Sequence, residues 1–191
     1  QTAKIDEYTR HLQALGKAGI PYTTYAHMPN GIWSTEPELI RGGAVARAFG
    51  TTPEKLRTAT DGCGIQTFAF PLREVARAWA FLADPAAVPA KDPRSAIAEP
   101  LAVVRDAMLA NPEMIGGRHD RLDTSVMKAA PGRLVSKSGM EALRGMAILP
   151  GTRVGTQHAD ASGMALKIED GDGFDRGTWA ASIEALRQAG V

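Results

Sequence analysis

Apolar residues recur every three or four positions through most of the first 110 residues. That spacing places apolar side chains on one face of an α-helix, and it predicts helices over residues 5–18, 38–49, 72–82 and 94–110. Gly50 is a stop signal after the second helix, and Pro100 predicts a kink in the fourth. The first part of the chain is therefore predicted to be helical.

The pattern changes after residue 132, where apolar and polar residues begin to alternate. This period of two predicts strands over 134–137, 142–149 and 164–168, and the short gaps between them favour antiparallel pairing. A last helix is predicted over 176–189. Its apolar face comprises Trp179, Ile183 and Leu186. Helices, then an antiparallel sheet, then a closing helix make an α+β fold with helices flanking the sheet.

The composition is that of a globular chain without a strong electrostatic field. Of its 191 residues 44% are apolar, and 22 Lys and Arg against 21 Asp and Glu leave a net charge of +1. This length suits a single domain over residues 1–191. Nucleic acid and membrane partners are not expected, because the chain has neither a basic field nor an apolar run of roughly 20 residues. We therefore expect a cytoplasmic protein.

The chain has one cysteine, Cys63, which excludes an internal disulfide. It lies in the segment Asp61-Gly62-Cys63-Gly64, which is a turn by composition, and the flanking glycines leave the thiol approachable. A thiolate is both a nucleophile and a soft metal ligand, although an unpaired cysteine is also common as a small buried apolar residue. No histidine has a spacing that marks it as a catalytic partner, so both interpretations stay open.

A Lys-Ser-Gly tripeptide, residues 137–139, lies at the end of the first predicted strand. Penicillin-recognising enzymes carry such a tripeptide along the active-site edge of their sheet, where the lysine holds charge beside the nucleophile and the glycine lets the substrate approach. Residues 125–128 also fit the Ser-x-x-Lys nucleophile motif. That segment ends only nine residues before Lys137, so we interpret it as a helical turn with Met127 in the core and Lys128 in water.

Five stretches in order carry a resemblance to a known family. They are Thr-Asp-Gly-Cys-Gly-Ile at 60–65 with Phe-Pro-Leu at 70–72, Ala-Met at 107–108 with Asn-Pro at 111–112 and Gly-Gly at 116–117, Asp-Thr at 123–124 with Val-Met at 126–127, Val-Ser-Lys-Ser-Gly at 135–139 with Glu141, and Gly-Met-Ala-Leu-Lys-Ile-Glu-Asp-Gly at 163–171. Over roughly residues 22–191 the chain resembles the C-terminal part of the L-asparaginase II family of rhizobial, thermolabile type.

The resemblance implies a fold similar to serine β-lactamases and glutaminases, and hydrolysis of L-asparagine to L-aspartate and ammonia. In the family a serine attacks the side-chain amide of this small-molecule substrate, lysines manage the proton, and two cysteines and a lysine hold a zinc ion. Matched by position, Lys137 is the second active-site lysine, Asp61 a substrate-side carboxylate and Cys63 a zinc ligand. Ser138 and Gly139 then lie beside the substrate.

The sequence also departs from the family pattern. The Cys-Ser-Gly-Lys-His motif is expected near the beginning of the chain, where residues 7–11 read Glu-Tyr-Thr-Arg-His. The second cysteine and the zinc-binding lysine are not found, and the nucleophilic serine is expected upstream of Gln1. Two alternatives therefore stay beside the asparaginase: an inactive amide-binding or scaffold member of the same fold, and an amidase for a different substrate. Family members tend to associate, which implies a homodimer.

Overall fold

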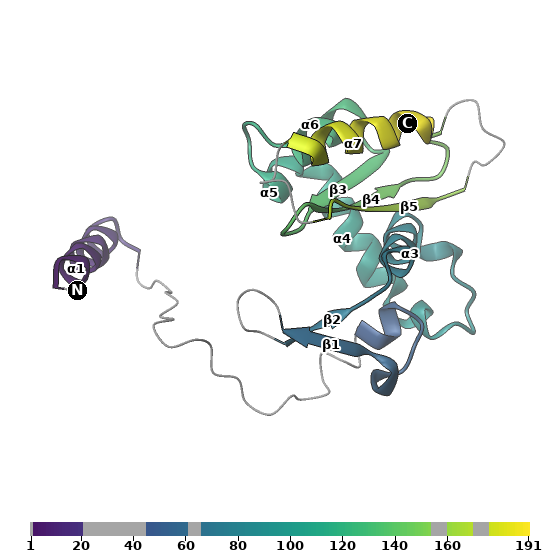
Figure 1. Cartoon of the computed structure of the whole chain (residues 1–191), viewed down its shortest axis with the longest axis horizontal. Helices are drawn as coiled ribbons and strands as arrows, with labels where there is room; N and C mark the ends of the chain where they lie inside the picture. The colour runs from purple at the N-terminus through teal and green to yellow at the C-terminus, as the bar shows by residue number, and fades with distance from the viewer. Residues whose placement is uncertain (1, 21–44, 61–65, 154–159, 170–175) are drawn as a thin grey trace. The chain divides into compact units, whose positions relative to one another are not determined.

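The computed structural model describes residues 2–20, 45–60, 66–153, 160–169 and 176–191 (Figure 1). Its internal contacts divide the chain into two compact units. One comprises Gln1–Thr35 and Thr60–Ile65, and the other comprises Glu36–Ala59 and Gln66–Val191. The single domain predicted over residues 1–191 stays a prediction. None of the helices in the described ranges is long and apolar enough to cross a membrane.

Helix α1, Thr2–Lys17, is the helix of the first unit, and it confirms the amphipathic pattern predicted over 5–18. The second predicted helix is described only from residue 45 onwards. Residues 45–48 are helical, and Gly50 ends the helix with a φ of +62°. A backbone in this left-handed region favours glycine, which explains the stop signal. A 3₁₀ turn at Pro53–Lys55 leads into strand β1, Arg57–Thr60, which pairs with β2, Gln66–Ala69.

The second unit is built around a three-stranded antiparallel sheet. Its strands are β3, Leu134–Ser138, β4, Leu143–Ile148, and β5, Ser162–Lys167, in the order β3-β4-β5. The three predicted strands and their antiparallel pairing are confirmed, and so is the α+β class. Since no described strand lies beyond β3, the Lys-Ser-Gly tripeptide is at an edge of the sheet.

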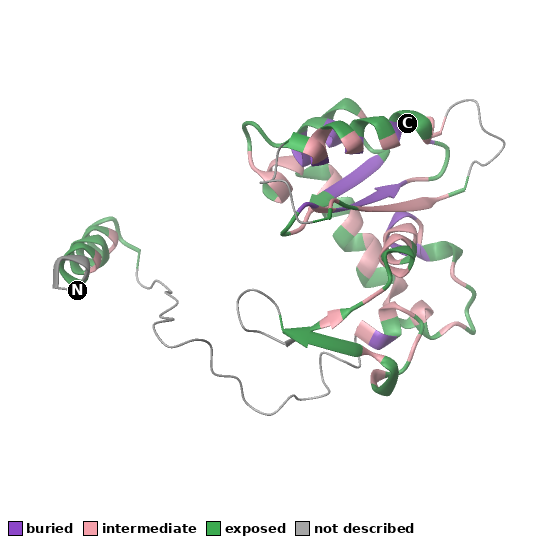
Figure 2. Ribbon diagram, viewed as in Figure 1, coloured by how far each residue is buried: buried purple, intermediate pink, exposed green. Residues whose placement is uncertain are grey.

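Helices cover both faces of this sheet, and the two faces carry separate parts of the core (Figures 1 and 2). Helices α6, Leu122–Ala129, and α7, Arg176–Gln188, pack on one face. Helices α3, Leu72–Ala83, and α4, Ala98–Ala110, pack on the other. Figure 2 shows that buried residues concentrate on β3 and β4. The larger cluster comprises Leu122, Val126, Leu134, Met146, Ile148 and Leu186, and the smaller comprises Leu82, Ala83, Met127, Val135 and Ala147.

Two glycines of the sheet allow α3 to approach closely. An ideal Cβ on Gly163 would lie 2.9 Å from the carbonyl carbon of Ala76, and closer still to the Ala76 carbonyl oxygen. A Cβ on Gly145 would lie 2.6 Å from Cζ2 of Trp79 and closer to the indole nitrogen. Real Cβ atoms essentially never come within 3.0 Å of another atom in this way. The packing of α3 therefore depends on both positions having no side chain.

The fourth predicted helix, 94–110, is wrong at its start. Residues Pro93–Ile97 form a 3₁₀ turn, and the α-helix α4 begins only at Ala98. The side chain of Asp92 caps the turn by accepting a hydrogen bond from the Arg94 N–H at 2.9 Å. Pro100 consequently lies in the first turn of α4, where a missing N–H removes no helical hydrogen bond, so the predicted kink has no cause there.

Two further details differ from the sequence pattern. The short helix α5, Pro112–Gly116, was not predicted. In α7, Leu186 is buried as predicted, but Ile183 is 50% exposed. The buried stripe of α7 instead runs through Thr178, Ser182 and Leu186, which are spaced by four residues. Thr178 and Ser182, two small polar residues, are thus buried, whereas hydropathy alone predicts that Ile183 is the buried residue.

Candidate active site

Lys137 and Ser138 form the end of β3, and Gly139 follows them. The Lys137 side chain is exposed, and its Nζ donates a hydrogen bond to the Ser138 carbonyl oxygen at 2.6 Å. In the register of the sheet, Lys137 lies opposite Gly145 and Ser138 opposite Arg144. The three predicted residues are therefore together at the edge of the sheet, with the ammonium group folded back along the strand.

The backbone of Ser138 faces the open edge of the sheet. The N–H of Gly139 donates to the carbonyl oxygen of Leu143 at 2.7 Å, and the N–H of Leu149 donates to that of Arg133 at 2.9 Å. Antiparallel pairing alternates, so the odd-numbered residues of β3 turn their backbone groups to β4 and the even-numbered residues turn theirs outward. Outward backbone groups of this kind can bind an extended ligand in the way that a further strand would.

A buried ion pair lies behind this edge. Asp123, in the first turn of α6, and Arg144, on β4, have side chains that are 4% and 3% exposed, and Arg144 Nη1 donates to Asp123 Oδ1. The same carboxylate oxygen accepts the Ser136 hydroxyl at 2.6 Å. The other oxygen, Oδ2, accepts the backbone N–H of Ser138 at 2.9 Å. One carboxylate thus connects α6, β3 and β4.

The turn after β3 has an unusual backbone. Glu141 and Ala142 have φ values of +54° and +58°, a region that residues with a side chain seldom adopt. Lys167, on β5, donates hydrogen bonds to the carbonyl oxygens of Glu141 and of Ile168, the latter at 3.0 Å. Lys167 is exposed, and its contacts hold the turn against β5.

Other predicted residues divide into those that the structure describes and those that it does not. Asp61 and Cys63 lie outside the described residues, so the carboxylate and zinc-ligand roles stay predictions. The interpretation of the Ser-x-x-Lys segment as a helical turn is confirmed, because it lies within α6 with Met127 buried. Lys128 is exposed and pairs with Glu113 at 2.6 Å.

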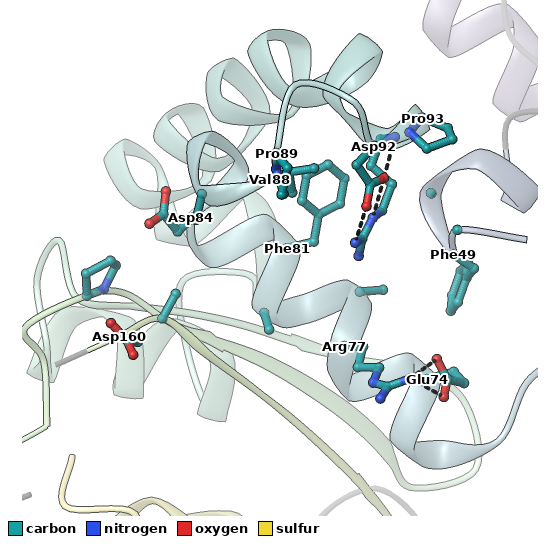
Figure 3. A pocket seen from close by; sticks show the side chains of 18 residues that line it. Phe49, Glu74, Arg77, Phe81, Asp84, Val88, Pro89, Asp92, Pro93 and Asp160 are labelled. Carbon is teal, nitrogen blue, oxygen red and sulfur yellow. Dashed lines mark hydrogen bonds and ion pairs between the residues drawn. The ribbon is translucent and has the colours of Figure 1, made fainter. Parts of the chain in front are cut away.

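A pocket of about 720 Å³ lies along α3 (Figure 3), and the tripeptide is not among its lining residues. Both arginines in its lining are already paired with a carboxylate of the same pocket. Arg77 bonds Glu74 at 2.9 Å, and Arg94 bonds Asp92 at 2.6 Å. The hydrogen bonds from Arg94 lower the pKa of Asp92 to about 2. Because these cations are engaged, the pocket offers neither arginine to a substrate carboxylate, and we place the candidate active site at β3.

The site residues that sequence reasoning missed are Arg144 and Ser136, together with the burial of Asp123. A signal for Arg144 was present, since it is the single charged residue in the strand Leu-Arg-Gly-Met-Ala-Ile. Within the described ranges, no group of three or more His, Cys, Asp or Glu could hold a metal ion. Cys63 lies outside these ranges, so the zinc site stays a prediction.

The chain matches one protein family. The sequence model described as L-asparaginase II matches residues 38–191, which is most of the chain and includes the whole of the β3 to β5 sheet. The chain belongs to the L-asparaginase II family. A search of curated proteins gives no significant match. Membership of this family supports an asparaginase-like amidohydrolase, and it confirms the resemblance found in the sequence.

Proposed function

We propose that this chain is the part of an L-asparaginase that carries the second active-site lysine, Lys137. One observation carries the proposal: in a member of the L-asparaginase II family, Lys-Ser-Gly lies at the open edge of an antiparallel sheet. The layers around this sheet, with α6 and α7 on one face and α3 and α4 on the other, are consistent with the proposed serine β-lactamase-like fold.

The proposed reaction is hydrolysis of the side-chain amide of L-asparagine in two steps. A serine supplied from outside residues 1–191 attacks the amide carbon, and its hydroxyl proton passes to a lysine amine. The C–N bond then breaks and the nitrogen leaves as ammonia after taking up that proton. Water attacks the resulting ester, and its cleavage gives L-aspartate and restores the serine hydroxyl.

In this reaction Lys137 accepts and returns the proton, or stabilises the developing negative charge. The substrate is proposed to lie along β3, where Ser138 has an outward backbone carbonyl and Gly139 has no side chain to obstruct the approach. Asp61 is the proposed carboxylate on the substrate side. Cys63 is the proposed zinc ligand, and metal analysis of the full-length protein with and without Cys63→Ser tests it. A homodimer is the proposed assembly.

The test is ammonia release from L-asparagine by the full-length protein, compared with its Lys137→Ala and Lys128→Ala variants. Lys128 is a matched control, because it is an exposed lysine that pairs with Glu113 rather than with the edge strand. Lys137→Ala should remove turnover and keep the fold, whereas Lys128→Ala should be as active as the parent. Full activity of Lys137→Ala would exclude the lysine from the mechanism.

Two results would replace the proposal with one of its alternatives. If the parent releases no ammonia but isothermal titration calorimetry detects L-asparagine binding, the chain belongs to an amide-binding member without catalysis. If L-asparagine neither binds nor reacts while another amide is hydrolysed, the protein is an amidase of different specificity.

A further inference from the structure

The ion pair of Asp123 and Arg144 is placed where it can control the candidate active site. Both side chains are almost completely buried behind the end of β3. Removing two charges from water costs about as much as their attraction returns, and apolar residues of similar volume are often as stable in such places. Stability alone therefore gives a weak reason for this pair, and its contacts supply a better one.

These contacts satisfy both carboxylate oxygens of Asp123. Its Oδ1 accepts from Arg144 and from the Ser136 hydroxyl, which leaves Oδ2 directed at the Ser138 N–H. The guanidinium group of Arg144 is less completely hydrogen-bonded, because its Nε is buried without a partner among the described residues. A guanidinium that leaves one of its own donors unused is positioned for the carboxylate, whose orientation it fixes.

Hydrogen bonds at Ser138 link Asp123 to Lys137. The Ser138 N–H is held by Asp123 at 2.9 Å, and the carbonyl oxygen of the same residue holds Lys137 Nζ at 2.6 Å. We infer that Asp123 and Arg144 are positioning residues, which fix the backbone of Ser138 and through it the resting position of the Lys137 amino group. This inference depends on the proposed function only in that Lys137 is taken as the proton acceptor.

The experiment replaces the pair by apolar residues of similar size, Asp123→Leu with Arg144→Met, in the full-length protein. The double variant avoids an unpaired buried charge, so it should keep its circular dichroism spectrum, and it should melt below the parent because the buried Ser136 hydroxyl loses its acceptor. Without the acceptor for Ser138, the strand end shifts. A displacement of about 1 Å near the reacting atoms can lower kcat about 100-fold, and we expect a fall of that order with little change in KM. Glu113→Gln, which breaks an exposed ion pair between α5 and α6, should leave kcat unchanged.

Hydrogen exchange of the Ser138 amide supplies a readout that does not require activity. It should be slow in the parent and in Glu113→Gln, and faster in the double variant. A folded double variant with parental kcat would overturn the inference. If the parent hydrolyses no amide, the proposed function fails by itself, and unchanged exchange at Ser138 in the double variant would still overturn the positioning role.

A second variant covers the case in which the apolar pair does not fold. Asp123→Asn with Arg144→Gln keeps polar side chains of similar shape without the charges. Neutral hydrogen bonds are roughly half as strong as charge-assisted ones, so we expect about a tenfold fall in kcat together with faster Ser138 exchange. Parental values of both quantities in this folded variant would exclude positioning by the buried charge.

Discussion

Gly145 tests whether α3 is held against the sheet by close packing. A methyl group at this position would lie 2.6 Å from Cζ2 of Trp79 and closer to two other atoms of the indole, whereas ordinary contact begins at 3.4 Å. The obstacle is a side chain, so the indole can move, but only by leaving a site between α3 and β4. We therefore expect Gly145→Ala to lower the free energy of unfolding by about 2 kcal/mol, within the range for an overpacked core.

A second substitution tests whether the indole is the obstacle. Trp79→Leu alone removes indole contacts and should cost about 2 kcal/mol, less than the full truncation of a tryptophan to alanine. In Gly145→Ala with Trp79→Leu, the new methyl group occupies space that the indole has left. The double variant should then be about as stable as either single variant, which corresponds to a coupling energy of about 2 kcal/mol.

Urea unfolding followed by circular dichroism measures all four proteins of this cycle. The single variants should also melt about 4–8 °C below the parent, given the length of the chain. Lys137 is the cross-strand neighbour of Gly145, so a displaced indole should reduce amidase activity as well. Strictly additive losses in the double variant would show that the indole is not what the methyl group strikes.

Gly163→Ala should lower the free energy of unfolding by about 3 kcal/mol or more, because the added methyl group meets the backbone of α3, which no side-chain substitution can move. The control is Gly16→Ala on α1, where the methyl group enters open space, and urea unfolding compares the two variants. Asp92→Asn should lower Tm at pH 7. Hydrogen bonds from Arg94 lower the pKa of Asp92 from 3.8 to about 2, so this carboxylate stabilises the fold fully above pH 3.8 and loses its effect as the pH falls through about 2. Melting curves of parent and variant between pH 7 and pH 2 should therefore converge at the acid end, and a constant difference would contradict this cause. Glu113→Gln should change Tm by little, as expected for an exposed pair.

Much of the fold could be predicted because its signals are local. The pattern over 72–82 and the alternation after residue 132 correspond to α3 and to the three strands within one or two residues. The start of α4 could not be predicted in this way, because it is set by the carboxylate of Asp92 bonding the Arg94 N–H. The spacing of apolar residues does not indicate that hydrogen bond. The buried face of α7 was predicted wrongly for the same reason: hydropathy does not show that Thr178 and Ser182 are the buried residues.

The candidate site divides similarly. Lys137, Ser138 and Gly139 could be found because they are consecutive and have a recognisable chemistry. Asp123 and Arg144 are 21 residues apart, and only the register of β3 against β4 and the packing of α6 bring them together. A sequence pattern can mark Arg144 as unusual in an apolar strand, but it does not name its partner. The segment with Asp61 and Cys63 lies outside the described residues.

In the proposed function β3 is an edge strand that binds substrate, and such a strand must also avoid pairing with other chains. Ser138 is placed to serve both requirements. Exposed N–H and carbonyl groups at the edge of a sheet invite pairing with another strand. At Ser138 the N–H is occupied by Asp123 and the carbonyl oxygen by Lys137 Nζ. The first contact is partly buried and charge-assisted, whereas the second is exposed and made by a flexible side chain. Of the two, the lysine can leave more easily, and its departure exposes the carbonyl to a substrate while freeing the amine for proton transfer. Binding and chemistry would thus begin with the same movement.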